Sequence, residues 1–162
     1  MDIETYVQRH YLEQILEAAN QRFQDMSAGQ FELRMCDIDK AGTGKNRGLD
    51  LMVYSAVTGK VREVRTLSGG ESFMAALSLA LGMADQIQKS SAAINLDMMF
   101  IDEGFGSLDE HSRDQAVKVL QNMAEGEKLI GIISHVTELK QEIEDQLIVT
   151  KDDQGSHTRS QG

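Results

Sequence analysis

Residues 96–110, LDMMFIDEGFGSLDE, decide the fold class of this chain. Within them, Met98 to Ile101 form a short continuous apolar run, which is typical of a strand covered on both sides. Such strands belong to α/β folds, and open α/β sheets bind their ligands at the carboxyl ends of the strands. Because Asp102 and Glu103 follow the apolar run directly, we expect both carboxylates to lie at the ligand-binding edge of a mostly parallel sheet.

The segments around this stretch alternate between helix and strand. A helix is expected from Ser68 onwards, because the apolar residues after it recur on one helical face. Another helix is expected around residues 116–124, with further strands at Leu129–Ile133 and Gln146–Thr150. This rhythm predicts an α/β lobe with crossover helices flanking the sheet. The tail from Asp152 to Gly162 is polar, and we expect it to be frayed.

The first third of the chain has a different pattern. Apolar residues recur at every fourth position from Asp2 to about Asp25, which predicts one long amphipathic helix. Strands are expected at Phe31–Met35, at Leu49–Val53 beyond the glycine-rich loop Gly42–Gly48, and after the Thr58–Gly59 turn. The sequence therefore divides into a helix (1–28), an antiparallel strand region (29–66) and an α/β lobe (67–162).

The composition fits one soluble domain of 162 residues, 41% of them apolar, with a formal net charge of −10. Domains that bind nucleic acid by themselves usually carry a basic patch, so this chain alone is a poor candidate for strong DNA binding. No run approaches the roughly 20 apolar residues of a membrane helix, and the start lacks a signal-peptide pattern. One cysteine, Cys36, cannot form an intrachain disulfide. We therefore expect a cytoplasmic protein with no membrane partner.

Residues 66–73, TLSGGESF, combine a helix start with two glycines. Ser68 and Glu71 form the S-x-x-E pattern of a capping box, in which each side chain accepts a hydrogen bond from the other residue's backbone N–H. A cap alone does not explain Gly69 and Gly70, since glycine costs about 1 kcal/mol in a helix interior relative to alanine. Without side chains there, an anion can approach the exposed N–H groups of the helix start. The glycine pair therefore suggests a phosphate site, although a plain helix cap is the more frequent explanation for such a turn taken alone.

The two acids after the apolar run can divide a task, because consecutive strand residues point in opposite directions. Asp102 is suited to hold Mg²⁺, directly or through water, while Glu103 is suited to orient and deprotonate a water that attacks a phosphoryl group. The structural alternative is a solvated acidic turn. Against that alternative stands Phe105, an aromatic residue between Gly104 and Gly106 where local packing does not obviously require one.

A histidine follows the strand expected at Leu129–Ile133. His135 comes after Ser134, at the same edge of the sheet where Asp102 is expected. A single histidine at a strand end is most often structural, so a functional role for His135 depends on the other motifs of the chain.

Four ordered motifs resemble those of the C-terminal half of an ABC-type ATPase head. LSGGE, the apolar run with Asp-Glu, Ser-Leu-Asp and the later strand with its histidine resemble the signature motif, Walker B, D-loop and switch histidine. The segments TLSGGESF, MFIDEGFGSLDE and GIISHVTEL are similar to the bacterial SbcC family of DNA-repair ATPases, relatives of the SMC proteins. The resemblance extends upstream through residues 6–33, so it covers nearly the whole chain.

This resemblance implies an ATP and Mg²⁺ site composed from two heads. Ser68 and the glycines would contact the γ-phosphate of an ATP held mainly by the opposing head, and residues 1–28 would form the base of a long coiled coil. Glu103 would be the general base, and His135 would sense the γ-phosphate. The implied cofactor-binding residues are Ser68, Gly69, Gly70, Glu71 and Asp109, the last in the D-loop across the dimer interface; Glu103 and His135 are catalytic and Asp102 accompanies Mg²⁺.

An ABC head also needs a P-loop, G-x-x-x-x-G-K-[ST], to cradle the phosphates. The nearest match, Asp39 to Asn46, has aspartate for the first glycine and asparagine for the final hydroxyl residue, so we interpret it as a hairpin loop. We therefore expect the chain to be a fragment that hydrolyses little or no ATP without a separate P-loop half.

The resemblance also implies partners for the complete protein. These are a second head in a homodimer, a nuclease similar to SbcD, and DNA in the full complex but weakly or not at all for this chain. The nuclease could dock near Tyr6 to Phe23. Two alternatives stay open at this point: a non-catalytic dimerisation or docking lobe, and the head of an SMC-type chromosome-organising protein without a nuclease.

Overall fold

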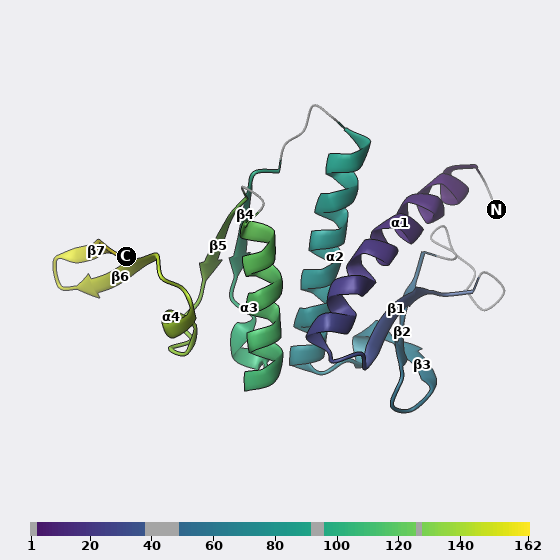
Figure 1. Ribbon diagram of the computed structural model, residues 1–162, viewed down its shortest axis with the longest axis horizontal. Helices are drawn as coiled ribbons and strands as arrows, with labels where there is room; N and C mark the ends of the chain where they lie inside the picture. The colour runs from purple at the N-terminus through teal and green to yellow at the C-terminus, as the bar shows by residue number, and fades with distance from the viewer. Residues whose placement is uncertain (1–2, 38–48, 92–95, 126–127) are drawn as a thin grey trace.

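The computed structural model describes residues 3–37, 49–91, 96–125 and 128–162. Its helices and strands form a mixed α/β arrangement, with α1 and α2 side by side, a three-stranded sheet beside α1 and the remaining elements beyond α2 (Figure 1). In chain order the elements are α1 (Ile3–Met26), β1 (Phe31–Met35), β2 (Leu51–Ser55), β3 (Lys60–Glu63), the 3₁₀ turn η1 (Val64–Thr66), α2 (Gly69–Ser90), β4 (Met98–Asp102), the 3₁₀ turn η2 (Phe105–Ser107), α3 (Glu110–Ala124), β5 (Leu129–Ile133), α4 (Leu139–Glu142), β6 (Gln146–Asp152) and β7 (Gly155–Gln161).

The first sheet is antiparallel, in the order β1-β2-β3, as the strand pattern predicted. In its register Leu33 lies opposite Val53, and Val53 lies opposite Arg62. Leu33 and Val53 are buried against the helices. Asn20 ties α1 to this sheet, because its side-chain amide donates to the Leu33 carbonyl (2.8 Å) and accepts from the Leu33 N–H (2.7 Å). The helix and sheet therefore form one packed unit.

The helices α1 and α2 cross closely at Gly82. A Cβ at Gly82 would lie 2.6 Å from the Ile15 carbonyl oxygen and 2.9 Å from the Ala19 nitrogen, both in α1. Only glycine permits this approach of two backbones. The crossing is part of one hydrophobic core, whose fully buried large side chains include Phe23, Met26, Leu33, Val53, Leu81, Phe105 and Val117.

The parallel sheet that the apolar runs predicted is present as the pair β4–β5, with Ile101 opposite Ile132. Its inner face packs into the core. The expectation that these strands are covered on both sides is wrong for the described chain, because only one face meets a helical layer. The outer face exposes four large apolar side chains: Met98 (55%), Phe100 (65%), Leu129 (57%) and Ile133 (54%).

The polar tail is ordered, contrary to the expectation that it frays. Residues Gly155–Gln161 form β7, which pairs antiparallel with β6 along its whole length in a hairpin that projects from the other elements (Figure 1). Backbone groups make these strand pairs, so polar side chains do not prevent them. Gly155 has φ +126° at the turn, and the Gln154 N–H donates to the Asp152 carboxylate at 2.8 Å.

Two further sequence predictions have different outcomes. The glycine-rich loop Gly42–Gly48 and the P-loop lookalike Asp39–Asn46 lie outside the described residues. Among the helices that the structure does describe, none is long and apolar enough to cross a membrane.

Candidate functional site

The start of α2 is the capping box that the sequence predicted. Ser68 is the N-cap, and its Oγ accepts a hydrogen bond from the Glu71 N–H at 3.3 Å. In return, the Glu71 carboxylate accepts from the Ser68 N–H at 2.8 Å. The serine and glutamate are therefore used by the helix itself, whatever else the turn binds.

The two glycines of this turn have different surroundings. A Cβ at Gly70 would lie 2.7 Å from the Ser107 carbonyl oxygen in η2, so the fold itself requires glycine there. A Cβ at Gly69 would make only an ordinary contact, 3.6 Å from the Ser107 Cβ. Packing thus explains Gly70, and Gly69 alone keeps the reason that the sequence suggested, a helix start left bare for a ligand.

The two acids lie at the carboxyl end of β4, as expected. Asp102 is the last residue of β4, and its side chain is exposed on the strand. Glu103 follows with φ +59°, a left-handed conformation that is uncommon and strained for a residue other than glycine. Its N–H donates to the Ile133 carbonyl at the end of β5, at 2.8 Å. This hydrogen bond holds Glu103 at the point where both parallel strands end.

His135 and Glu103 come together, although 32 positions separate them in the sequence. The His135 Nδ1 lies 3.0 Å from the Glu103 carboxylate, in the geometry of a hydrogen bond. Because a carboxylate only accepts, Nδ1 carries the proton and donates it, which leaves Nε2 facing away from Glu103. Both side chains are accessible, with 83% of His135 and 49% of Glu103 exposed.

Phe105 has a structural reason that the sequence did not reveal. It is fully buried, and its ring meets that of Phe73 edge-on, with 5.0 Å between centroids. Gly104, at φ +100°, lies directly under the Phe73 ring, since a Cβ there would be 2.2 Å from two ring carbons. The view that local packing does not require this aromatic is therefore wrong. Phe73 fastens the turn after Glu103 to the first turns of α2.

Asp109 is the N-cap of α3. Its carboxylate accepts from the Ser112 N–H at 2.8 Å and from the Ser112 hydroxyl at 3.1 Å. The backbone hydrogen bond is the main reason that the pKa of Asp109 lies below its usual value. As with Ser68, a residue that the resemblance assigns to a nucleotide site also caps a helix.

The structure gathers the motif residues into two groups. Ser68, Gly70, Glu71 and Asp109 share the wall of one pocket of about 270 Å³, which lies between the starts of α2 and α3 and the end of α1. Asp102, Glu103 and His135 lie outside that pocket wall, at the edge of the β4–β5 sheet. In the described part of the chain, no three His, Cys, Asp or Glu side chains are grouped to hold a metal by themselves.

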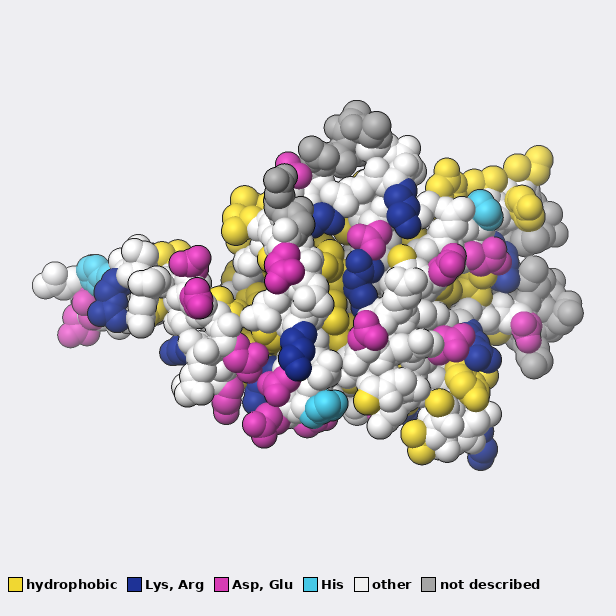
Figure 2. Space-filling view, in the orientation of Figure 1, with side chains coloured by type: hydrophobic (Ala, Val, Ile, Leu, Met, Phe, Trp, Pro, Cys, Tyr) yellow, Lys and Arg dark blue, Asp and Glu magenta, His cyan; other side chains and the backbone are white. Residues whose placement is uncertain are grey.

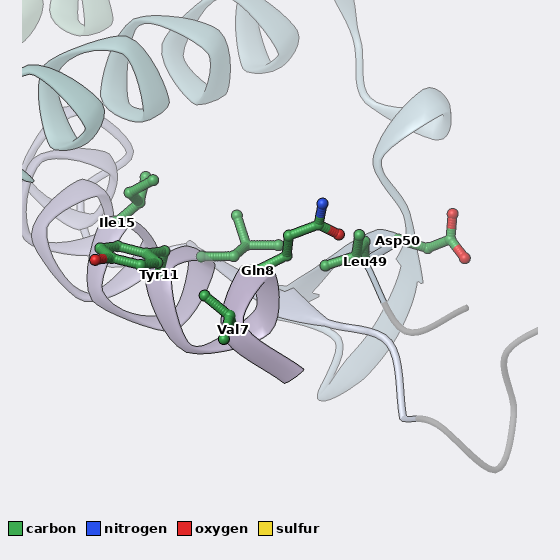
Figure 3. Close-up of a pocket in the computed structure, with 7 residues that line it drawn as sticks. Val7, Gln8, Tyr11, Ile15, Leu49 and Asp50 are labelled. Carbon is green, nitrogen blue, oxygen red and sulfur yellow. The ribbon is translucent and has the colours of Figure 1, made fainter. Parts of the chain in front are cut away.

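A larger pocket of about 530 Å³ lies away from both groups. It runs beside the first half of α1 and is lined by Val7, Gln8, Tyr11 and Ile15 from the helix and by Leu49 and Asp50 ahead of β2 (Figure 3). Its walls are mainly apolar and contain one carboxylate, so its chemistry suits packing better than phosphoryl transfer. Apolar side chains also gather on the surface at the start of α1 (Figure 2).

Sequence reasoning missed one residue beside the α2 start. Arg62 pairs with the Glu71 carboxylate, at 3.2 Å between Nη2 and Oε2. The only signal available was the alternation of β3, which puts Arg62 on the face that carries Val53 and Leu33. A charged residue at such a position indicates a specific partner.

Comparisons with known proteins converge on one family. The family model for the SbcC/RAD50-like Walker B motif matches residues 48–122. The chain is 51% identical over 147 residues to the SbcC subunit of the SbcCD nuclease from Treponema pallidum, and 42% identical over 159 residues to that from Staphylococcus epidermidis. These matches cover 91% and 98% of the chain but only 14% and 16% of the curated relatives, so the chain spans about one seventh of their length.

Solved structures agree on the fold. A structure from work on ATP-driven dimerisation and DNA-stimulated activation of SMC ATPases matches 98% of this chain and 89% of its own, with a TM-score of 0.71 and 18% identity. The Smc head domain of Pyrococcus furiosus, with an extended coiled coil and bound to the C-terminal domain of ScpA, matches 96% of this chain and 36% of its own, with a TM-score of 0.67 and 18% identity. The fold is therefore that of an SMC-type head.

Proposed function

The chain belongs to the SbcC family, and from this premise we propose that it is the C-terminal lobe of an ATPase head. In this proposal the lobe contributes residues to two ATP sites, each of which is formed by two heads together. The observation that carries the proposal is the contact between Glu103 and His135, at the sheet edge where both parallel strands end. This pair lies apart from the Ser68 pocket, as expected if each group serves a different nucleotide.

The residues at the sheet edge fit a magnesium–nucleotide complex. Mg²⁺ is usually held by one or two carboxylates together with substrate phosphates, so a site with few protein ligands is sufficient. Asp102 is the carboxylate that would accompany the ion, because it is exposed at the strand end. The ion neutralises charge on the phosphates when it is bound.

Glu103 acts as the general base in this proposal. Its carboxylate is accessible, and the hydrogen bond from its backbone N–H to the Ile133 carbonyl holds the residue at the end of the two strands. The Nδ1–H of His135 orients that carboxylate, and Nε2, which faces away from it, would have to carry a second proton to donate a hydrogen bond to a phosphate oxygen. Such a positioned base typically contributes 10²–10⁴-fold to the rate.

The start of α2 serves the opposing head. Ser68 and the bare N–H groups of Gly69 and Gly70 would face the γ-phosphate of a nucleotide held by that head, with Asp109 at the same interface. A helix N-terminus favours such an anion. Glu71 would act indirectly, by stabilising the turn, because its carboxylate already accepts the Ser68 N–H.

Two surfaces support the proposed partners. The apolar outer face of β4–β5 also carries Asp102, so a P-loop lobe packed there would bring its nucleotide to this carboxylate. The first half of α1 exposes Ile3, Tyr6 and Tyr11 beside the larger pocket, which suits the second helix of a coiled coil or a docked nuclease segment.

For the whole protein, we propose that ATP-driven dimerisation of two heads regulates a nuclease partner similar to SbcD, on DNA, in the cytoplasm. ATP binding would hold the heads together, and hydrolysis by Glu103 would release them. The relatives named as part of the SbcCD nuclease favour this over a chromosome-organising role.

The test is ATP hydrolysis by this chain, alone and mixed with a separately produced P-loop half. We expect turnover only in the mixture, and a loss of about 10²-fold or more for Glu103→Gln. Glu103→Gln should also accumulate the ATP-bound dimer, which size-exclusion chromatography detects. If the wild-type mixture assembles but is as inactive as the variant, the chain is a non-catalytic docking lobe, and the helix-capping roles of Ser68 and Asp109 are their whole function.

A further inference from the structure

Arg62 lies between the antiparallel sheet and the start of α2. In the β2–β3 register it is opposite Val53, so it is on the face of the sheet that carries the core residues. Its guanidinium carbon lies 5.7 Å from the centre of the Phe31 ring, and 37% of its side chain is exposed. An arginine in this half-buried place is directed by its neighbours rather than free in solvent.

The guanidinium contacts the chain on both sides of Ser68. Nη1 donates to the Thr66 carbonyl at 3.0 Å, before the helix begins. Nη2 donates to Glu71 Oε2 at 3.2 Å, in the first turn of the helix. The same Oε2 accepts the Ser68 N–H at 2.8 Å. Arg62 therefore links the 3₁₀ turn η1, which precedes the helix, with the carboxylate that caps the helix.

From this geometry we propose that Arg62 is a positioning residue for the Ser68–Glu71 turn. This inference rests on the proposed function of that turn in contacting a nucleotide of the opposing head. The capping box defines the shape of the turn, but it is local and does not fix the turn relative to the sheet. The two contacts of Arg62 supply that link, and they set the direction in which the N–H groups of Gly69 and Gly70 face.

The side chain must be arginine for this task. The guanidinium is a rigid planar fork that donates in two directions at once, whereas a lysine ammonium is a single point on a flexible stem. Lysine would keep the ion pair with Glu71 but could not reliably hold the Thr66 carbonyl as well. In this proposal the fork acts on how tightly the turn holds bound nucleotide, and a loss of such ground-state binding raises KM without lowering kcat.

The experiment measures ATP turnover by the assembled head, this chain together with a P-loop half, across ATP concentrations. For Arg62→Ala we expect the half-saturating ATP concentration to rise about 5-fold with kcat within about twofold of wild type, and for Arg62→Lys about half of that rise on a logarithmic scale. Hydrogen–deuterium exchange of the peptide 64–73 should increase in Arg62→Ala.

The matched control is Arg34→Ala. Arg34 lies on β1 of the same sheet, pairs with Glu32 at 3.0 Å, and has its guanidinium carbon 4.1 Å from the centre of the Tyr54 ring. Like Arg62, it pairs with a carboxylate and lies over an aromatic ring, but it does not reach the α2 start. Its half-saturating ATP concentration and the exchange of residues 64–73 should match wild type.

The outcomes separate this inference from the proposed function. If Arg62→Ala leaves the exchange of residues 64–73 unchanged, or lowers kcat and leaves the half-saturating ATP concentration unchanged, the inference is overturned while the ATPase proposal stands. If the wild-type head does not hydrolyse ATP, the proposed function fails, and the role for Arg62 toward nucleotide fails with it even where exchange increases.

Discussion

The two main sheets of this chain treat their outer faces differently. Both pack one face toward the helices and the common core. The outer face of β1–β3 carries charged side chains and one exposed large apolar residue, Val61 (49%), and Arg34 there pairs with Glu32 and covers the Tyr54 ring. The outer face of β4–β5 carries Met98, Phe100, Leu129 and Ile133, all more than half exposed.

This difference separates a sheet whose outer face suits contact with water from one whose outer face suits contact with another protein surface. Ion pairs and aromatic side chains covered by arginine suit a surface that faces water. A cluster of exposed large apolar side chains marks an interaction surface. The motif acids follow strand β4 of the second sheet, so the proposed chemistry lies at the border of a surface that needs a partner. Three predictions test this contrast.

The largest effect is expected from truncating matched apolar residues in the two sheets. Leu33 is 1% exposed and Phe100 is 65% exposed. Leu33→Ala removes a packed core side chain and should lower the free energy of unfolding by about 3 kcal/mol. Phe100→Ala removes a larger side chain but should cost less than about 1 kcal/mol in this chain, because water already covers most of it.

Chemical denaturation of both variants measures this contrast, with the midpoint and slope compared to wild type. Binding of a P-loop half should show the opposite order, with a larger loss of affinity for Phe100→Ala than for Leu33→Ala. A cost for Phe100→Ala as large as that for Leu33→Ala would mean that the outer face is covered within this chain.

The sequence predicted the order and type of most elements, because the apolar periodicity is strong in α2 and α3 and apolar residues recur at every fourth position in α1. It could not show that one face of β4–β5 stays open. An apolar run such as Met98–Ile101 looks the same whether its second cover comes from this chain or from another. It also missed β7, since polar residues such as those of Gly155–Gln161 have no periodic apolar signal.

The site was predicted unevenly for similar reasons. The motif order indicated Glu103 and His135, and the parallel topology brings them together. Contacts between distant segments left no local pattern, so the roles of Arg62 and Phe73 were not visible. The sequence suggested one reason for both glycines, a helix start left bare for a ligand. In the structure, Gly70 is required because the Ser107 carbonyl lies close to it, and only Gly69 has space beside it.

The second prediction concerns the junction between the two regions. Gly104 follows the motif acids and lies under the Phe73 ring of α2. Gly104→Ala adds backbone strain at φ +100° and a methyl group in the space of that ring, so we expect a loss of about 2–3 kcal/mol in unfolding free energy. ATP turnover of the assembled head should also fall, because Glu103 is the adjacent residue.

Gly59→Ala is the matched control for backbone strain. Gly59 has φ +66°, and nothing lies within 4 Å of a Cβ placed there. It should lose only the cost of the left-handed conformation, about 1 kcal/mol, and leave turnover unchanged. Thermal unfolding of both variants gives the comparison, and equal losses would contradict a contact between Gly104 and Phe73 that restrains the acidic turn.

The smallest effect is expected from pH, at the helices that follow the motif acids. Burial, and then the neighbouring Asp114 carboxylate, raise the pKa of Glu142 at the end of α4. The folded state therefore holds this proton more tightly than the unfolded state does. Its contribution to stability is greatest below the unfolded pKa, and it falls as pH rises from that value through the folded pKa.

Glu142→Gln removes this dependence and should be more stable than wild type above that window, by less than about 0.5 kcal/mol. Asp109 acts in the opposite sense, because its pKa is lowered by the Ser112 N–H and its stabilising charge is lost as pH falls. A single pH profile therefore mixes two opposing trends. Subtracting the wild-type unfolding free energy from that of Glu142→Gln at each pH cancels the Asp109 contribution, since both proteins contain it. A difference that does not grow as pH rises would mean that Glu142 is as well solvated in the folded chain as in the unfolded one.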